Sequence, residues 1–221
     1  MKKVLEISNL KKYYHTMSEE ILALKDISFD LYEGEFISIV GPSGCGKSTI
    51  LSILSGLIEK SSGTIKMEDK TIAYMLQNDS LFNFRTILNN CLLGLEIQNK
   101  LTEENKKYVI DLLNTYGLKD FINSYPTSLS GGMRQRVALI RTLATKPNLI
   151  LLDEPFSALD YQTRLAVSDD VYKIIKNENK SAIMVTHDIA EAISLANKVI
   201  VLSNRPSVVK KVYDIKFSEK G

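Results

Sequence analysis

The hydrophobic residues of this chain follow distinct patterns, and each pattern predicts a kind of secondary structure. Apolar and polar residues alternate over residues 4–7 and 27–32, which is typical of half-buried strands that we expect to be antiparallel. Other runs are apolar at nearly every position, which indicates parallel strands buried on both faces. These runs are residues 36–40, 149–152, 182–185 and 199–202.

The period becomes helical between residues 87 and 146, where no strand-like run occurs. The clearest helices are predicted over residues 105–116 and 133–146, and Pro147 ends the second of them. A stretch of helices between strand-forming segments indicates a helical lobe that is inserted into an α/β core.

No repeat, low-complexity tract or linker divides the sequence, so we expect one α/β domain over residues 1–221. Its RecA-like core would comprise residues 1–86 and 147–221, with a mostly parallel sheet and antiparallel strands near the N-terminus. Residues 87–146 would form the helical subdomain. The polar and apolar tail over residues 210–221 predicts one more edge strand.

Polar residues follow three of the apolar runs directly. A glycine-rich segment begins at Gly41, Asp153-Glu154 follows residue 152, and Thr186-His187-Asp188 follows residue 185. Because ligands bind beyond the carboxyl ends of strands in open parallel sheets, these three groups should meet at one edge. The run over residues 199–202 completes the sheet without polar chemistry at its end.

Composition narrows the class of protein without naming its chemistry. The 221 residues are 44% hydrophobic and 24% charged, as in ordinary soluble globular proteins. A formal net charge of +2 does not favour nucleic acid or an anionic membrane as a direct partner. Cys45 and Cys91 lack disulfide or zinc-ligand spacing, so we expect reduced cytosolic thiols. Neither a signal peptide nor a run of about 18 apolar residues is found.

The glycine-rich segment fits the phosphate-binding pattern G-x-x-x-x-G-K-[ST]. Its glycines let the backbone approach a nucleotide triphosphate, and the following helix presents its N-terminus to the phosphates. Lys47 would meet the β- and γ-phosphates, and the Ser48 hydroxyl would ligate Mg2+. The alternative is a glycine-rich turn without a ligand, which the preceding strand disfavours. The candidate nucleotide-binding residues here are Gly41, Pro42, Ser43, Gly44, Cys45, Gly46, Lys47, Ser48 and Thr49.

A second glycine-rich turn is more specific than the first. Leu129-Ser130-Gly131-Gly132-Met133-Arg134-Gln135-Arg136 opens a second helix shortly before Asp153-Glu154. The order of these three motifs resembles the nucleotide-binding subunit of ATP-binding cassette (ABC) transporters, and the resemblance covers nearly the whole chain. It implies the ABC-type P-loop NTPase fold, with ATP and Mg2+ as cofactors.

The resemblance also implies how two copies work together. Ser130, Gly131 and Gly132 form a phosphate-binding helix N-terminus without a lysine, and in the family they cover ATP held by the other subunit. The active form would be a head-to-tail homodimer with two shared sites. Residues 157–160 look like the D-loop, whose Asp160 reaches across that interface. Asp160 is alternatively a helix cap, and it can serve both purposes.

Catalytic roles are implied for residues beyond the phosphate loop. Asp153 matches the Walker B position that holds Mg2+, and Glu154 is placed to accept a proton from the attacking water. The alternative for Glu154 is a cap of the local turn before Pro155. Gln77 resembles the glutamine that touches the metal and reports nucleotide state to the membrane subunit.

His187 matches the switch histidine that contacts the γ-phosphate, whereas His15 is expected to be a loop residue in the polar insertion over residues 15–20. Tyr14 resembles the aromatic residue that stacks on adenine. The spacing Lys12-x-Tyr14 favours it, and the adjacent Tyr13 is the alternative.

Several further stretches resemble the importers of nitrate, sulfonate, taurine and thiamine precursors. These stretches include residues 81–86, 94–96, 125–126 and 203–206. The resemblance implies a transmembrane permease as partner, a substrate-binding protein as an indirect one, and a place at the cytoplasmic face of the membrane. Asn83 and Phe84 replace the usual Pro and Trp, Asn197-Lys198 replaces Asp-Arg, and residues 63–77 are shorter than usual.

The residues Phe82 and Phe84 follow Gln77 in an otherwise polar loop. The resemblance implies that they form part of a groove where a short permease helix docks. The alternative is that both rings pack beneath the helical lobe.

Three rival functions can be weighed. A DNA-repair or chromosome-organising ATPase would carry long coiled coils or zinc-ligand cysteines between the motifs, and neither is found. A lipid, lipoprotein or peptide exporter ATPase is disfavoured by the importer-like stretches. A regulatory ATP binder without catalysis would be expected to lack Glu154 or His187, and both residues are present.

Overall fold

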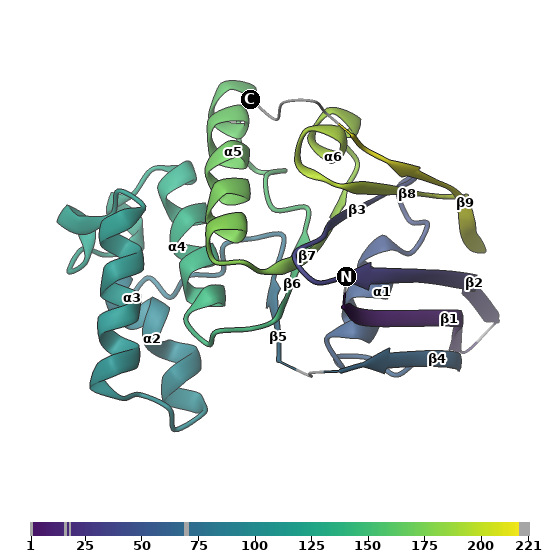
Figure 1. Ribbon diagram of the computed structural model, residues 1–221, viewed down its shortest axis with the longest axis horizontal. Coiled ribbons are helices and arrows are strands. Elements are labelled where there is room, and N and C mark those ends of the chain that lie inside the picture. The colour runs from purple at the N-terminus through teal and green to yellow at the C-terminus, as the bar shows by residue number, and fades with distance from the viewer. Residues whose placement is uncertain (1, 16, 18, 69–70, 217–221) are drawn as a thin grey trace.

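The computed structural model describes residues 2–15, 17, 19–68 and 71–216. Within these residues, the strands form one sheet in the order β4-β1-β2-β9-β8-β3-β7-β6-β5 (Figure 1). The strands are β1 (Lys3–His15), β2 (Glu20–Tyr32), β3 (Phe36–Val40), β4 (Ser62–Met67), β5 (Ile72–Met75), β6 (Leu149–Asp153), β7 (Ser181–Thr186), β8 (Lys198–Leu202) and β9 (Ser207–Asp214).

The middle of the sheet is parallel, from β8 through β3, β7 and β6 to β5. Every residue of β3, β6 and β7 is buried, which confirms the prediction made from the apolar runs. Successive side chains point to opposite faces. Ile150 and Leu152 accordingly join one hydrophobic core, whereas Leu149 and Leu151 join the other.

The N-terminal strands are antiparallel, as predicted, and they are longer than the alternating patterns indicated. The strand β1 pairs with β2 from Lys3 to His15 and also with β4. The insertion predicted over residues 15–20 is shorter in the structure, and the expectation that His15 is a loop residue is wrong. His15 is the last residue of β1 and pairs with Glu20, the first residue of β2. Residues 16 and 18 of the connection lie outside the described part.

The predicted edge strand over residues 210–221 is wrong in its place and its bounds. The strand β9 begins at Ser207 and lies between β2 and β8, antiparallel to β8 and parallel to β2 near Leu24. The alternating pattern identifies a strand but contains no information on its neighbours, which are set by contacts distant in sequence. Residues 217–221 lie outside the described part of the chain.

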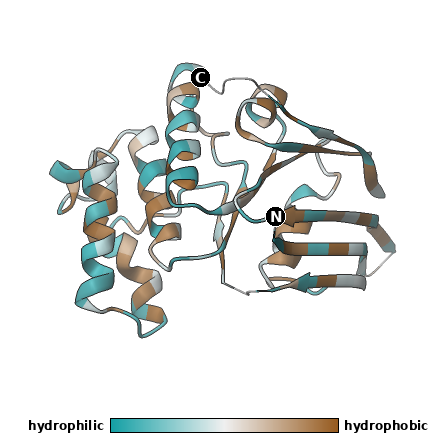
Figure 2. Ribbon diagram, in the orientation of Figure 1, coloured by the Kyte–Doolittle hydropathy of each residue, from teal (hydrophilic) through white to brown (hydrophobic). Residues whose placement is uncertain are grey.

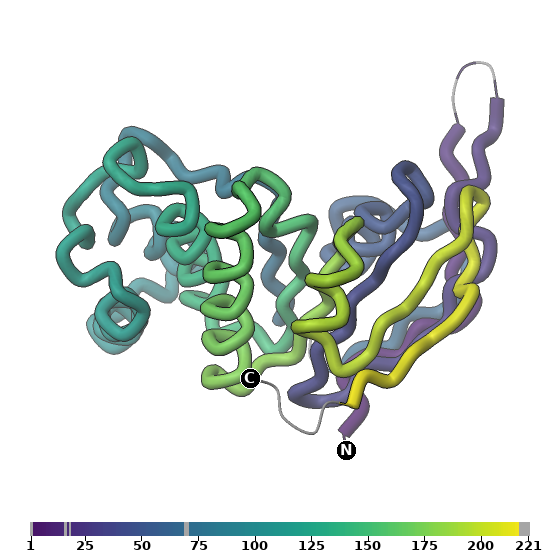
Figure 3. The backbone as a smooth tube through the Cα atoms, turned by 90° about the horizontal axis from the view of Figure 1, so that it is seen from above, coloured from purple at the N-terminus to yellow at the C-terminus, as the bar shows by residue number. Residues whose placement is uncertain are grey.

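Helices cover both faces of the sheet and form one end of the molecule. Figure 3 shows α2, α3 and α4 at one end and the antiparallel strands at the other. Polar and apolar residues mix along α5 (Figure 2). Its residues Val167, Val171 and Ile174 are buried. None of the described helices has the length and apolar character needed to cross a membrane. The α-helices are α1 (Lys47–Leu54), α2 (Ile87–Ile97), α3 (Glu103–Thr115), α4 (Gly131–Leu143), α5 (Tyr161–Asn177) and α6 (Ile189–Leu195), and short 3-10 turns span Lys119–Phe121 and Pro126–Ser128.

Both helices predicted most clearly are present, with starts that lie two residues earlier than expected. Thr102 caps α3 by accepting a hydrogen bond from the amide of Asn105, and Ser130 caps α4 in the same way. The helix α4 ends at Leu143, and Lys146 adopts a left-handed backbone with φ 52° before Pro147. Capping hydroxyls therefore set the helix starts, which hydrophobic periodicity alone places too late.

Candidate functional site

Three neighbouring strands deliver the predicted chemistry to one edge of the sheet. The phosphate loop follows β3, Asp153 ends β6, and His187 follows β7, which lies between β3 and β6. The sequence therefore correctly predicts that these groups converge at the carboxyl ends of the parallel strands.

The phosphate loop is folded tightly around the side chain of Lys47. The glycines Gly44 and Gly46 adopt φ values of 72° and 106°, which other residues rarely take. Lys47 is only 6% exposed, and its Nζ donates to the carbonyl oxygens of Gly41 (2.9 Å) and Pro42 (3.2 Å). The ammonium group is thus held where an anion over the loop would meet it.

A cavity of about 260 Å³ lies over this loop. Its position at the start of α1 suits a phosphate group, because the first amides of a helix point outward and carry positive partial charge. The lining residues are Ser43, Gly44, Gly46, Lys47, Ser48, Thr49 and Glu154.

The two cysteines are free and buried, as expected for structural thiols. Cys45 contributes bulk within the phosphate loop, where its Sγ would lie 2.9 Å from a Cβ placed on Gly41. Gly41 therefore has no room for a side chain. Burial raises the pKa of Cys91 to about 12, so this thiol stays protonated and unreactive near neutral pH.

Asp153 accepts hydrogen bonds from two hydroxyl groups. Its Oδ1 accepts from Ser48 Oγ at 2.9 Å, and its Oδ2 accepts from the Tyr74 hydroxyl at 2.7 Å. Burial and the bond to Asp153 raise the pKa of Tyr74, which remains a donor. Sequence reasoning missed Tyr74, whose only signal is its place three residues before Gln77.

The donor set at Asp153 fits Mg2+. This is not a site formed by protein side chains alone, because within the described residues no three or more His, Cys, Asp or Glu side chains are grouped so that they could hold a metal ion. Ser48 and Asp153 supply adjacent oxygen ligands, and Mg2+ typically takes one or two protein oxygens and completes its shell with phosphates and water. The site therefore fits a metal ion that arrives with a nucleotide.

Glu154 lies at the centre of the remaining predicted residues. Its Oε2 is 3.3 Å from His187 Nδ1 and 3.4 Å from Gln77 Nε2, which also lies 3.3 Å from Ser157 Oγ. The backbone of Glu154 has a φ of 44°, an uncommon conformation for a residue with a side chain. The structure thus brings Gln77, Glu154 and His187 together beside the phosphate loop.

Tyr14, rather than Tyr13, faces the phosphate-loop helix. Its hydroxyl lies 3.3 Å from Thr49 Oγ1 in α1, and the Nζ of Lys12 is 5.1 Å from its ring centre. Because successive strand residues point to opposite faces, Tyr13 is directed away from Thr49. This placement favours Tyr14 as the aromatic residue available to a base above the loop.

The second glycine-rich turn begins α4 and packs closely against α5. A Cβ on Gly132 would lie 2.7 Å from Val167 Cγ2, and one on Gly131 would lie 3.0 Å from Leu159 Cδ2. Ser130 caps the helix by accepting from the amide of Met133 at 3.3 Å. None of Ser130, Gly131 and Gly132 lines the cavity over the phosphate loop as the described residues define it.

Asp160 is the N-cap of α5, accepting from the amide of Thr163 at 3.1 Å. Hydrogen bonds from Thr163 hold the pKa of Asp160 below its ordinary value. The alternative interpretation as a helix cap is therefore confirmed, and a further role across an interface stays a prediction.

Two arginines that sequence reasoning did not assign tie the loop after Gln77 to α4. Arg134 Nε lies 2.9 Å from Asp79 Oδ2, and its Nη1 donates to the carbonyl of Leu129 at 2.7 Å. Arg141 donates to the backbone carbonyls of Asp79 and Ser80 at 2.6 and 2.8 Å. The membership of Arg134 in the second glycine-rich motif was the available signal.

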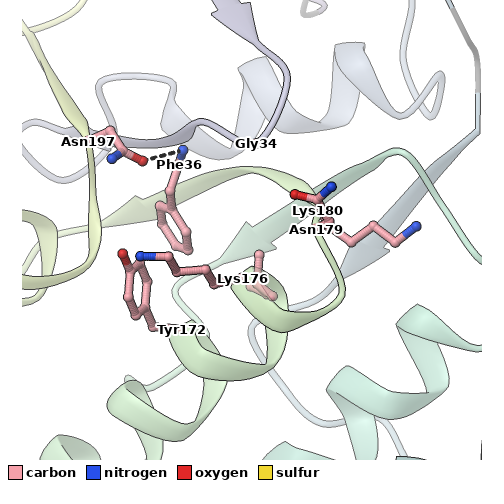
Figure 4. A pocket seen from close by; sticks show the side chains of 8 residues that line it. Gly34, Phe36, Tyr172, Lys176, Asn179, Lys180 and Asn197 are labelled. Carbon is pink, nitrogen blue, oxygen red and sulfur yellow. Dashed lines mark hydrogen bonds between the residues drawn. The ribbon is translucent and has the colours of Figure 1, made fainter.

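A second cavity, of about 150 Å³, lies at the opposite ends of the strands (Figure 4). Phe36, the first residue of β3, lines it together with Tyr172, Lys176 and Asn197. Asn197 Oδ1 accepts from the Phe36 amide at 2.9 Å. This cavity is thus separate from the phosphate loop, which follows the last residue of β3.

Comparisons with known proteins agree with this geometry. Residues 24–157 match the family model described as ABC transporter. The chain is 47% identical over 218 residues to the ABC transporter ATP-binding protein YtlC of Bacillus subtilis (strain 168), covering 96% of this chain and 84% of that protein. It is 38% identical over 221 residues to the taurine import ATP-binding protein TauB of Pelagibacter ubique, covering 96% and 83%.

Solved structures of similar proteins show the same fold. The dimeric ABC transporter cassette MJ0796 superposes with a TM-score of 0.81 at 31% identity, covering 96% of this chain and 99% of that one. Another structure of MJ0796 is a dimeric post-hydrolysis state with bound ADP and Pi. With its motifs gathered at one sheet edge and these similarities over most of its length, the chain belongs to the ATP-binding proteins of ABC transporters and is an ATPase with the cassette fold.

Proposed function

We propose that this chain is the ATP-hydrolysing subunit of a multi-subunit importer for a small solute. It works with Mg2+ as a head-to-tail homodimer at the cytoplasmic face of the membrane, where it is held by a transmembrane permease. A substrate-binding protein is an indirect partner, and nucleic acid is not a partner. The observation that carries this proposal is an exposed aromatic pair, Phe82 and Phe84, in the loop that follows Gln77 in the sequence.

The hydrolytic step follows from the residues around Glu154. Lys47 and the amides of the phosphate loop hold the β- and γ-phosphates, and Tyr14 stacks on the base. Ser48 and Asp153, with Gln77 nearby, would hold Mg2+, which would supply positive charge against the charge developing on the phosphates. Glu154 accepts a proton as the water oxygen bonds to the γ-phosphorus and the bond to the bridging oxygen of ADP breaks.

The proposal of a homodimer is supported by the position of the second glycine-rich turn, which does not reach the phosphate loop of its own chain. Ser130, Gly131 and Gly132 offer helix amides to a phosphate and do not line the chain's own phosphate-loop cavity. A second copy would bring them over the nucleotide, and each copy would complete the other's site. Asp160 caps α5 and would face the partner copy.

The docking surface for the permease would be formed by Phe82 and Phe84. These side chains are 41% and 77% exposed, and their ring centres lie 5.4 Å apart. This exposure disfavours the alternative in which both rings pack beneath the helical lobe. Exposed aromatic residues in an otherwise polar loop are typical anchors of protein interfaces.

A buried amide holds the loop that carries this pair. Asn90 in α2 is fully buried and accepts from the Phe82 amide at 2.7 Å. Its Nδ2 lies 3.0 to 3.1 Å from the carbonyl oxygens of Phe82, Arg85 and Thr86. The two rings are therefore displayed from a fixed backbone.

The solute class rests on the relatives. Proteins named for transport of nitrate and for import of taurine and aliphatic sulfonates are 35% to 38% identical to this chain over most of its length. Small oxyanions and organic sulfonates are therefore the solutes that we propose to test first.

The change Phe84→Asp tests the proposal. The variant should fold and hydrolyse ATP in solution like the wild type, because its side chain contacts solvent. It should lose co-purification with the permease and fail to support solute uptake, since a charge would be buried without a partner at the interface. Assembly is measured by affinity capture of the permease in detergent.

The matched control is Ile97→Asp, which changes an apolar side chain that is 73% exposed at the far end of α2. This variant should assemble and transport normally. The proposal is wrong if Phe84→Asp still assembles and transports, or if it melts well below both the wild type and the control.

A further inference from the structure

The turn that carries His187 is fixed by side chains on both sides. Thr186 is 2% exposed, and its Oγ1 donates to Glu191 Oε2 at 2.7 Å and accepts from the amide of Asp188 at 3.0 Å. Asp188 Oδ1 accepts from the amides of Ala190 and Glu191 at the start of α6. The backbone of His187 therefore moves only if this small network moves.

Arg164 connects this network to another functional segment. Its Nη1 lies 3.4 Å from Asp188 Oδ2, and its Nε lies 3.7 Å from Glu191 Oε1. Its Nη2 donates to the carbonyl oxygen of Leu159 at 3.0 Å. The guanidinium group thus joins the residue before Asp160 to both carboxylates that flank the His187 turn.

The chemistry of an arginine suits this connection. Burial raises the pKa of Glu191, and the nearby positive charge of Arg164 opposes that shift. A guanidinium group is planar and offers several donors in a fork, so it can reach three acceptors that one ammonium cannot. Lysine could retain the charge at this position but not the three-way contact.

One contact of Arg164 in this network is longer than a hydrogen bond in the single chain. Arg164 Nε makes no hydrogen bond to any described residue, and its distance of 3.7 Å from Glu191 is too long for one. A displacement of residues 157–160 of less than 1 Å could shorten this contact, by the usual N to O distances of about 2.7–3.2 Å. Movement at that segment can therefore reach the His187 turn through one side chain.

We infer that Arg164 is a positioning residue that aligns His187 with Glu154 and the γ-phosphate when residues 157–160 meet a second copy of the chain. This inference rests on the proposed homodimer, in which that segment faces the partner copy. Arg164 does not line the cavity over the phosphate loop, so it should govern turnover rather than nucleotide affinity.

The change Arg164→Gln tests this role in the full-length chain. The kcat for ATP should fall about tenfold with KM within about twofold, because small misplacements of catalytic groups cost up to ~10² in rate. The control Lys198→Gln removes a comparably buried ion pair, with Glu35 at 2.8 Å, at the opposite ends of the strands, where β8 begins. It should leave kcat unchanged.

A double-mutant cycle separates positioning from a merely structural role. The kcat losses of Arg164→Gln and Thr186→Val should not add, because both interrupt the same path to His187. Additive losses, a rise of KM in parallel with the fall of kcat, or a kcat equal to that of Lys198→Gln would each overturn the inference. If Arg164→Gln does not fold, Arg164→Lys gives the same comparison, with a smaller expected loss.

Different measurements test the role of Arg164 and the homodimer on which it rests. A wild-type ATPase whose specific activity is independent of protein concentration, with light scattering showing monomers, contradicts the homodimer itself. A wild type that behaves as a dimer, beside an Arg164→Gln variant with normal turnover, contradicts the role of Arg164 alone.

Discussion

Two helices of this chain begin at glycine-rich turns, and the turns differ in what they offer to an anion. At α1, Gly46 adopts a left-handed backbone and Lys47 folds back over the loop, so a positive side chain is present. At α4, Ser130 caps the helix and the next two residues are glycines, of which Gly131 lies against Leu159 and Gly132 against Val167 in α5. The first turn has a lysine charge and a cavity, whereas the second offers a serine cap and the helix amides.

This difference assigns the two turns to different tasks. A loop with a lysine and enclosing amides can hold phosphate by itself, while a helix N-terminus contributes a weaker attraction that needs an already bound anion. The second turn is therefore suited to complete a site rather than to form one. The proposed homodimer supplies the site that it completes.

The largest effect is expected for Glu154→Gln. This variant should accumulate as an ATP-bound dimer in which both turns contact the same nucleotide. Losing a general base costs about 10²–10⁴-fold in rate, while the amide preserves the shape of the side chain. The variant should bind ATP and elute as a dimer on size exclusion, whereas ADP should leave it monomeric. Turnover at the wild-type rate would assign the proton acceptor elsewhere, with His187 as the next candidate.

The change Lys47→Ala should weaken the first turn selectively. Hydrogen bonds to charged groups contribute about 1.5–3 kcal/mol, so ATP affinity should fall roughly 10- to 150-fold. Isothermal titration of the single chain measures this loss. In the matched variant Ser130→Ala, the chain should keep its monomeric ATP affinity while its kcat falls. Equal losses of affinity in the two variants would contradict the division of tasks.

A steric change at the second turn should have a moderate effect. In Gly132→Ala, the new Cβ would lie 2.7 Å from Val167 Cγ2, and overpacking of this kind costs about 1–3 kcal/mol. The melting temperature should fall by roughly 2–10 °C. Adding Val167→Ala should restore part of it by making room. If the double variant melts at or below the lower of the two single variants, close packing is not the reason for glycine here.

The smallest effect concerns Asp160, which caps the helix against which the second turn packs. Its pKa lies below the ordinary 3.8, so its cap stabilises the fold above that pH and is lost as pH falls through the lower folded value. The change Asp160→Ala should lower the melting temperature slightly at pH 7, and the difference should narrow below pH 3.8. Asp160→Asn, which caps without titrating, should stay close to wild type at pH 7.

Much of the fold and part of the site could be predicted from local sequence. The buried strands β3, β6 and β7 follow from apolar runs, because burial on both faces leaves no polar positions. The meeting of Lys47, Glu154 and His187 follows from the rule on carboxyl ends of parallel strands.

The rest depends on contacts between residues that are distant in sequence. The place of β9 between β2 and β8 is set by pairing across the whole chain. Tyr74 reaches Asp153 only because β5 pairs with β6, and Arg164 reaches Asp188 only because α5 and α6 lie side by side. No periodicity in a single segment encodes such neighbours.

The buried amide of Asn90 has a thermodynamic consequence for assembly. Ordering a flexible loop at an interface costs conformational entropy, at about 1–2 kcal/mol for each residue whose backbone becomes fixed. The loop of Phe82 and Phe84 is already fixed by hydrogen bonds between its backbone and the Asn90 side chain, which accepts one and donates the others. The entropy is thus lost when the chain folds, and the aromatic pair meets its partner preorganised, with more of its contact energy available as affinity.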